Sequence, residues 1–247
     1  WVFSGAIAET PSAPVGAVVD VVSHTGDWLA RGLLNPGCAL SVRVYTRDEN
    51  QPLDDAFFAG LVDQSLAWRK GLSAGESETC NAQRLIFSEA DGISGLIVDR
   101  YADALAVQVG AAALLPFLPT ILNRLRALTG VQHLHVGVDE DDATREGLEV
   151  GRVAAFGTPD LPPVGIREYG LQFEVDLGTG QKTGFYLDQR VNRKRVAEYA
   201  RGRRVLSAYC YTGAFEVHCA AAGATSITGI DRSEAALDRA RRHFELN

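Results

Sequence analysis

Hydrophobic and polar positions change their spacing several times along the chain, and each change marks a different kind of element. Three short stretches near the start, 15–22, 28–32 and 39–45, are rich in apolar and β-branched residues. Gly, Pro and Asn separate them at intervals typical of short strands, so they predict a small β-barrel. Residues 54–70 instead place apolar side chains at helical spacing, which predicts a helix capped by an aspartate.

The middle of the chain returns to strands. Predicted strands at 83–87, 95–98 and 104–109 are followed by a predicted helix at 114–128 and a strand at 133–138. This order is typical of an α+β domain. Pro162 and Pro163 then interrupt the pattern, because consecutive prolines fit neither a helix nor a strand ladder.

The last third alternates strands with helices. Apolar and polar residues alternate strictly over 171–177, which predicts a half-buried strand. Further helices and strands alternate over 186–200, 204–208, 214–222, 226–230 and from Ser233 onward. A β-α-β-α order predicts parallel strands in a doubly wound, Rossmann-like sheet.

These patterns predict three domains in the 247 residues, over 1–52, 53–165 and 166–247. The third holds 82 residues, whereas a complete doubly wound domain needs about 150. We therefore expect only the N-terminal part of that domain here. The chain also begins at Trp1 and contains no Met, which supports the expectation of an incomplete sequence.

Composition narrows the class of protein. Hydrophobic residues make up 46% and charged residues 22%, which excludes a disordered, collagen-like or coiled-coil chain. No uncharged apolar run approaches the length of a membrane span, and the start does not resemble a signal peptide. The four cysteines lie far apart, and His133 and His135 have no third ligand nearby. We expect a reduced, cytoplasmic protein without a metal site.

Positive charge is concentrated in one segment. The chain has a net charge of −7, but residues 181–204 alone carry +6 and residues 1–180 carry −12. A uniformly basic nucleic-acid-binding surface is therefore excluded. The segment itself is either a positive patch for a nucleic acid or an ordinary solvated helix face.

The sharpest local motif is the strand, glycine turn and helix at residues 205–215 (VLSAYCYTGAF). Such a turn lets backbone N–H groups face a ligand at the start of a helix. The next predicted strand ends at Asp231, whose carboxylate can accept both hydroxyls of a ribose or can cap the following helix. The combination indicates a cofactor that contains adenosine, without choosing between NAD and S-adenosylmethionine.

Two motifs supply a family resemblance. Residues 181–193 (QKTGFYLDQRVNR) and 205–215 resemble motifs of the PUA-containing, S-adenosylmethionine-dependent methyltransferases of large-subunit ribosomal RNA, whose best-known members make 5-methylcytosine. Residues 1–5 and 31–36 resemble the PUA domain of that family, and 84–101 resemble its central domain. The resemblance extends over the whole chain, although Ala214 stands where the family has a second glycine.

The resemblance implies a fold and partners. The implied fold consists of a PUA-like barrel, a central α+β domain and a Rossmann-like methyltransferase domain that is truncated here at its C-terminus. The implied cofactor is S-adenosylmethionine and the implied partner is large-subunit ribosomal RNA. A cytoplasmic location follows, no membrane is involved, and a homodimer is one assembly to consider. Trp1, Arg31, Arg43 and Arg47 are candidate RNA contacts.

The resemblance also assigns the cofactor site. Its implied cofactor-binding residues are Thr183, Phe185, Asp188, Gln189, Arg190, Tyr209, Tyr211, Thr212, Gly213, Phe215, Asp231 and Ser233. In this assignment Asp231 would hold the ribose and Asp188 or Gln189 would meet the methionine ammonium. Arg190 would meet the methionine carboxylate or the RNA backbone.

Methylation of cytosine C5 would need a cysteine thiolate that adds to C6 and a base that removes the C5 proton. None of the four cysteines stands where the family has its nucleophile, so we expect no catalytic residue in this chain. The same fold could instead methylate guanine N7, which needs no cysteine, or serve a non-catalytic RNA-binding protein. An NAD-dependent oxidoreductase is disfavoured, because the turn has a single glycine.

Overall fold

The computed structural model describes residues 1–72, 79–178, 180 and 182–247. The chain forms two compact units. Unit 1 comprises Trp1–Ala74 and Arg84–Leu161, and unit 2 comprises Gly75–Gln83 and Pro162–Asn247. Gln181, the first residue of the motif at 181–193, lies outside the described residues. One boundary between the units falls before Pro162, and residues 75–83, which the sequence placed in the central domain, belong to unit 2. The predicted division into three domains stays a prediction.

The first sheet of unit 1 is antiparallel and curled. It has the strand order β1-β4-β3-β2. Its strands are β1 (Val2–Phe3), β2 (Val18–Val22), β3 (Trp28–Leu34) and β4 (Leu40–Thr46). The pairing of β3 with β4 shifts by one residue next to Gly32. A Cβ at Gly32 would lie 2.4 Å from the carbonyl oxygen of Arg43, so this close approach requires glycine.

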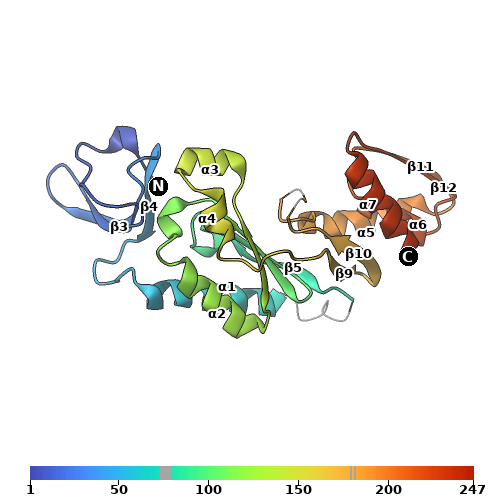
Figure 1. The fold of residues 1–247 in the computed structure, drawn as a ribbon, viewed down its shortest axis with the longest axis horizontal. Coiled ribbons are helices and arrows are strands. Elements are labelled where there is room, and N and C mark those ends of the chain that lie inside the picture. The colour runs from blue at the N-terminus through green and yellow to red at the C-terminus, as the bar shows by residue number, and fades with distance from the viewer. Residues whose placement is uncertain (73–78, 179, 181) are drawn as a thin grey trace. The chain divides into compact units, whose positions relative to one another are not determined.

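The second sheet of unit 1 holds the main hydrophobic core. Its strands are β5 (Ala82–Phe87), β6 (Leu96–Tyr101), β7 (Ala104–Val109) and β8 (His133–Gly137) in sequential order. Strands β6 and β7 pair antiparallel, and β7 and β8 pair parallel through a crossover that contains a helix. Helices α1 (Asp55–Leu72) and α2 (Leu118–Thr129) pack against each other on one side of this sheet (Figure 1). The predicted α+β order is therefore present.

Some boundaries differ from the sequence-based prediction. Helix α2 begins at Leu118 rather than at 114, because Ala112–Leu114 form a separate 3-10 helix and Pro116 has no N–H with which to continue it as an α-helix. Two short helices were not predicted, α3 (Glu140–Glu146) and α4 (Val150–Ala154). The signal for α3 is present in the sequence, because Asp139 caps its first N–H groups and Gly147 ends it in a left-handed conformation.

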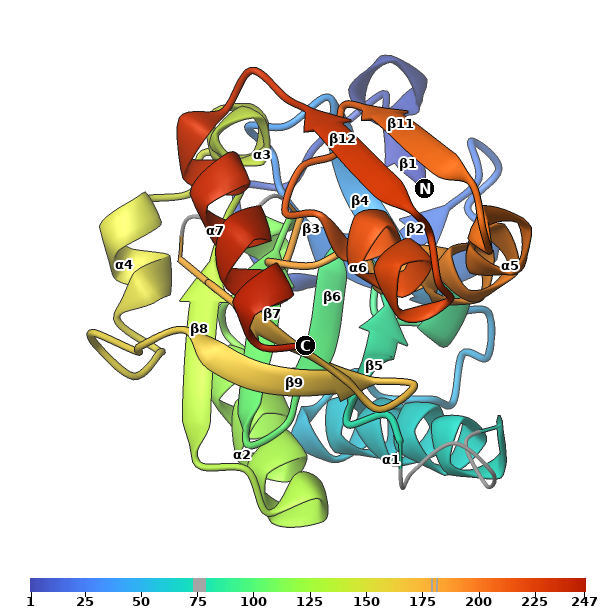
Figure 2. The same cartoon turned by 90° about the vertical axis from the view of Figure 1, so that its right-hand side faces the viewer.

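Unit 2 begins with a hairpin and continues as a parallel βαβα unit. Strands β9 (Val164–Glu168), which was not predicted, and β10 (Leu171–Val175) pair antiparallel. The elements α5 (Arg190–Ala200), β11 (Arg204–Ala208), α6 (Ala214–Ala221), β12 (Ser226–Ile230) and α7 (Glu234–Glu245) follow. Strands β11 and β12 lie side by side and parallel, as predicted (Figure 2). Helix α5 starts at Arg190 rather than at 186, because 187–189 form a 3-10 turn.

In the described parts of the chain, no helix is both long and apolar enough to cross a lipid bilayer.

Phe58 tests the core of unit 1. Its side chain is fully buried, stacks on Phe117 at a centroid distance of 4.4 Å and contacts Tyr45 edge-on. Replacing Phe58 by Ala leaves a cavity and should lower the free energy of unfolding of unit 1 by about 3–5 kcal/mol. All three tryptophans lie in unit 1, so urea unfolding followed by tryptophan fluorescence reports on this unit. Gln64→Ala, on the exposed side of α1, which also carries Phe58, should change the free energy of unfolding by less than about 0.5 kcal/mol. Equal effects of the two substitutions would contradict this account of the core.

Candidate cofactor site

Unit 2 contains a pocket of about 680 Å³ beyond the carboxyl ends of β11 and β12. This is the edge at which parallel α/β sheets bind ligands, and the volume is ordinary for a small-molecule site. One wall follows the hairpin and consists of Lys182, Phe185, Tyr186, Asp188, Gln189 and Arg193. The loop after β11 contributes Tyr209, Cys210, Tyr211, Thr212, Ala214 and Phe215. Asp231 and Arg232 follow β12 and complete the lining.

The loop after β11 has an unusual backbone. Tyr209 and Tyr211 have φ values of 60° and 49°, in the left-handed region that non-glycine residues rarely adopt. Gly213 has φ 73°, and a Cβ there would lie 2.8 Å from the Cβ of Ala240 on α7. Glycine is therefore required for α6 to start so close to α7. Left-handed positions of this kind cost free energy and concentrate at functional sites.

Asp231 connects the two strand ends. Its Oδ2 accepts a hydrogen bond from the Tyr211 N–H at 2.9 Å, and its Oδ1 accepts one from the Ser233 N–H at 3.0 Å. These backbone donors hold the pKa of the carboxyl below its usual range. Ser233, not Asp231, caps α7, because its hydroxyl accepts from the Ala236 N–H. Each carboxylate oxygen of Asp231 keeps a second lone pair with which it can accept a ligand hydroxyl.

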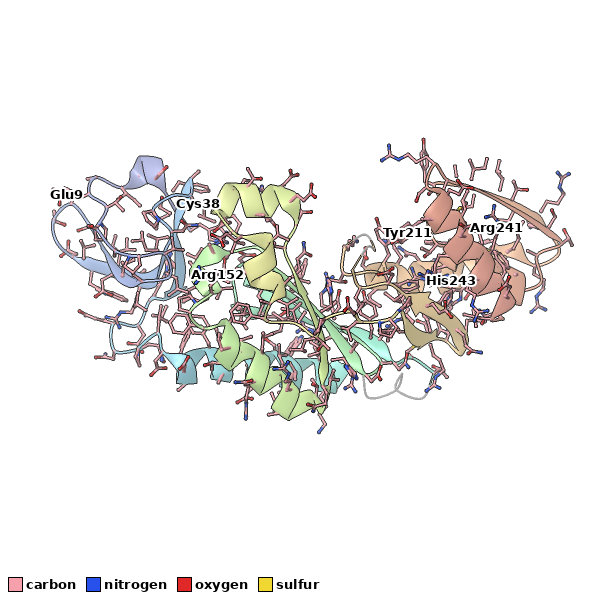
Figure 3. The ribbon with its side chains drawn as sticks, in the orientation of Figure 1. Glu9, Cys38, Arg152, Tyr211, Arg241 and His243 are labelled. Carbon is pink, nitrogen blue, oxygen red and sulfur yellow. The ribbon has the colours of Figure 1, made fainter. Side chains whose placement is uncertain are left out.

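His243 of α7 contacts the backbone of the loop after β11. The imidazole is completely buried, and its Nδ1 lies 2.7 Å from the Thr212 carbonyl oxygen. Its Nε2 accepts the Glu174 N–H of β10 at 3.0 Å. Burial lowers the pKa of His243 and so favours the neutral ring, which donates at one nitrogen and accepts at the other. His243 of α7 thereby joins the hairpin to the loop that carries Tyr211 (Figure 3).

Arg193 is a buried cation in the wall of the pocket. Its Nε and Nη2 donate to the two carboxylate oxygens of Glu168 at 2.6 and 2.7 Å, and both side chains are 1% exposed. The guanidinium also lies 4.7 Å from the centroid of the Phe185 ring. A bidentate pair held in this way fixes the direction of the cation toward the pocket.

Two family models match this chain, one at each end. Residues 154–247 match the family model of the S-adenosylmethionine-dependent methyltransferases, and residues 1–47 match a PUA-like domain. The chain carries a PUA-like domain and a methyltransferase domain. The methyltransferase domain contains the whole pocket described above.

Curated relatives align over the full length of the chain. One is the ribosomal RNA large subunit methyltransferase I of Cronobacter sakazakii, which is 37% identical over 251 residues. The protein of the same name from Escherichia coli strain K12 is 35% identical over 250 residues. The alignments cover 100% of this chain and 62% of each relative, so the chain spans less than two thirds of their length.

A solved structure shares the fold. The crystal structure of SMU.776 complexed with SAH matches 95% of this chain and 59% of that chain, with a TM-score of 0.79 and 23% sequence identity. This likeness supports the Rossmann-like methyltransferase fold with its N-terminal PUA-like domain.

Most of the residues expected to bind a cofactor line the pocket of the methyltransferase domain. They are Phe185, Asp188, Gln189, Tyr209, Tyr211, Thr212, Phe215 and Asp231. The other four are placed elsewhere. Thr183 is buried beside the pocket, Gly213 precedes α6 and Ser233 caps α7. Arg190 donates to the Ala82 carbonyl oxygen and lies 3.5 Å from Glu168.

Six lining residues were not predicted: Lys182, Tyr186, Arg193, Cys210, Ala214 and Arg232. Lys182 donates to Asp188 at 2.9 Å and lies over the Tyr186 ring. Burial alone would raise the pKa of Asp188, but this lysine and Gln189 outweigh it and lower the pKa. Arg193 lies three residues after Arg190 and so close to the same face of a helix, but its pairing with Glu168 leaves no local signal in the sequence.

The ion pair of Glu168 with Arg193, which lines the pocket, can be tested by substitution. Burial would raise the pKa of Glu168, but hydrogen bonds from Arg193 and His218 prevail and lower the pKa from 4.5 to about 2. Replacing Glu168 by Gln leaves Arg193 buried without its anion and should destabilise unit 2 by about 3–5 kcal/mol. Hydrogen exchange of peptides from α5 and α6 measures this loss. Glu174→Gln, in the half-exposed pairs of β10 with α7, should cost less than about 1 kcal/mol.

The same carboxylate gives unit 2 an acid sensitivity. The pKa of Glu168 is lower in the folded than in the unfolded chain. Its contribution to the free energy of unfolding of unit 2 is therefore complete above pH 4.5 and is lost as pH falls toward about 2. Protection of α5 and α6 should therefore decline over this window in the wild type. Glu168→Gln should show a smaller decline, and an equal decline in both proteins would contradict the assignment.

Proposed function

We propose that the pocket of unit 2 binds S-adenosylmethionine and that the protein methylates large-subunit ribosomal RNA. The observation that carries this proposal is the position of Asp231, whose carboxylate faces the pocket from the end of β12 opposite the loop after β11. This is the arrangement in which a ribose is held by two charge-assisted hydrogen bonds. The family model over 154–247 and the names of the relatives support the cofactor and the substrate.

Different lining residues would contact different parts of the cofactor. Asp231 would accept the two ribose hydroxyls, and Phe185 and Phe215 would provide apolar walls. Asp188, whose carboxyl is held ionised, would meet the methionine ammonium with Gln189. Thr183, Gly213 and Ser233 would act by holding the loops in place. Bound in this pocket, the cofactor supplies an electrophilic sulfonium methyl group.

We assign the methionine carboxylate to Arg193 rather than to Arg190. Arg193 lines the pocket, and its Nη1 makes no hydrogen bond in the part of the chain that the structure describes. Arg190 is directed to the Ala82 carbonyl oxygen and to Glu168 instead. Glu168 orients the guanidinium of Arg193 and so acts as a positioning residue.

For the target atom we propose cytosine C5, with guanine N7 as the alternative. The C5 reaction requires a thiolate. Burial raises the pKa of Cys210, and the nearby carboxylates of Glu216 and Asp231 raise it further. Cys210 is therefore a poor nucleophile although it lines the pocket, and we assign no catalytic residue among these 247. Action on ribosomal RNA further implies a cytoplasmic location, and a homodimer stays a prediction.

Cofactor binding is testable on this chain directly. Isothermal titration calorimetry with S-adenosylmethionine should show one site, and Asp231→Asn should weaken binding about tenfold or more, because it removes a charge-assisted bond. Asp238→Asn, a surface carboxylate of α7 that pairs with Arg241, should leave the affinity unchanged. Absence of binding by the wild type would contradict the proposal.

Methyl transfer is tested on the full-length gene product. It should be incubated with methyl-labelled S-adenosylmethionine and unmodified large-subunit RNA, and the digested nucleosides should be analysed by mass spectrometry. Labelled 5-methylcytidine supports the C5 assignment, and 7-methylguanosine would replace it by the alternative. Cofactor binding without transfer to any nucleoside would contradict the proposed substrate.

A further inference from the structure

The basic residues of 181–204 separate into two groups in the structure. In the first group, Arg190 and Arg193 lie within ion-pair distance of the buried Glu168, and the exposed Lys182 pairs with Asp188. The other five are exposed and form no ion pair within the described residues: Lys194, Arg195, Arg201, Arg203 and Arg204. The sequence alone shows a single cluster of charge, whereas only the second group is available to a partner.

We propose that this second group, together with Tyr199, forms a binding surface for the RNA strand that leads to the cofactor pocket. We call Lys194, Arg195, Tyr199, Arg201, Arg203 and Arg204 the basic ridge. The inference rests on the proposed function, because it takes the substrate to be RNA, and it adds the protein surface that receives the RNA backbone.

Helical geometry places the ridge outward. On α5 the buried residues are Arg193, Ala197 and Ala200, which define the face packed into unit 2. Arg195 and Tyr199 are one turn apart on another face, and the Tyr199 side chain is 69% exposed. Helix α5 ends at Ala200, and Gly202, with φ 68°, turns the chain into β11. Arg203 precedes this strand and Arg204 is its first residue.

The charges of the ridge are not neutralised within the protein. In the described residues, no carboxylate forms an ion pair with Arg195, Arg201, Arg203 or Arg204. Glu198 is the one acid on this part of α5. Helix α7 of the same unit is different, because its Arg239, Arg241 and Arg242 all pair with acids. Unpaired, exposed guanidinium groups are suited to phosphate oxygens, whose counterions they displace.

The ridge begins beside the pocket and extends away from it along α5, to Arg204 at the amino end of β11. Asp188 and Gln189, immediately before α5, line the pocket, and the helix extends from there for about 16 Å at 1.5 Å per residue. A strand whose target base enters the pocket can therefore lay its adjacent phosphates along α5. Tyr199 offers a face on which an unpaired base can stack, which favours single-stranded RNA over a simple polyanion.

Two of the four candidate RNA contacts in unit 1 are less available than the ridge, whereas Trp1 and Arg47 are exposed and stay predictions. Arg43 is buried and donates to Glu146 at 2.6 Å, and Arg31 is paired with Asp20 and bonded to the carbonyl oxygens of Glu49 and Gln51. Arg31 and Arg43 are therefore held by contacts within the protein, whereas the ridge arginines form no ion pair in the described part of the chain.

The test compares two double variants that lose the same charge. Arg195→Gln with Arg203→Gln removes two ridge cations, and Arg241→Gln with Arg242→Gln removes two paired cations of α7. Binding of a fluorescently labelled single-stranded RNA of mixed sequence is measured by anisotropy at several salt concentrations. The ridge variant should bind more weakly and should reduce the slope of log K against log salt by about 1.4, the value for two phosphate contacts. The α7 variant should keep the wild-type slope.

Further measurements separate the remaining outcomes. Tyr199→Ala should weaken binding of the RNA about tenfold and leave binding of polyphosphate unchanged, because polyphosphate has no bases. The proposal is overturned if the ridge variant keeps the wild-type salt slope, or if polyaspartate or anionic vesicles compete more strongly than RNA. Calorimetry with S-adenosylmethionine on the same variants shows that the pocket is intact. Normal cofactor binding by the ridge variant together with an unchanged salt slope refutes the ridge alone. Absence of methyl transfer to RNA by the full-length wild-type protein refutes the proposed function.

Discussion

The buried carboxylate of Glu168 is the interaction on which the rest of unit 2 depends. It ends β9, accepts hydrogen bonds from Nε and Nη2 of Arg193 on α5 and lies 3.1 Å from His218 of α6. Three elements that are distant in sequence thereby meet at one charge. An ion pair buried to this degree gains little net stability over an apolar contact, but it is costly to break. Its effect is to fix where the guanidinium points, and that direction defines one wall of the pocket.

Near this centre, the loop after β11 is held by hydrogen bonds between its backbone and two side chains. Asp231 holds the Tyr211 N–H, and His243 joins Thr212 to β10. Left-handed residues in the same loop are kept in place by these bonds and by the contact of Gly213 with α7. This loop is therefore held in place by the protein's own contacts, which reduces the entropy lost when a ligand binds to it.

The sequence predicted the order of the elements better than the details of the site. The βαβα unit was predicted correctly, because apolar periodicity and the glycine turn after β11 are local signals. Strand β9 was missed, although Val164–Glu168 alternates buried and exposed residues and is followed by the tight turn at Tyr169 and Gly170. Arg193 could not be assigned, since its role depends on Glu168, 25 residues earlier in the chain. Likewise, net charge located a basic segment but did not distinguish paired from unpaired cations.

The central claim is that Asp231 and Arg193 hold the two ends of one cofactor, and a crystal structure of the chain grown with S-adenosylmethionine tests it most directly. The account predicts both ribose hydroxyls within hydrogen-bond distance of the Asp231 carboxylate and the methionine carboxylate on Nη1 of Arg193. A cofactor bound outside this pocket, or one whose carboxylate is held by Arg190 with Arg193 turned away, would contradict it.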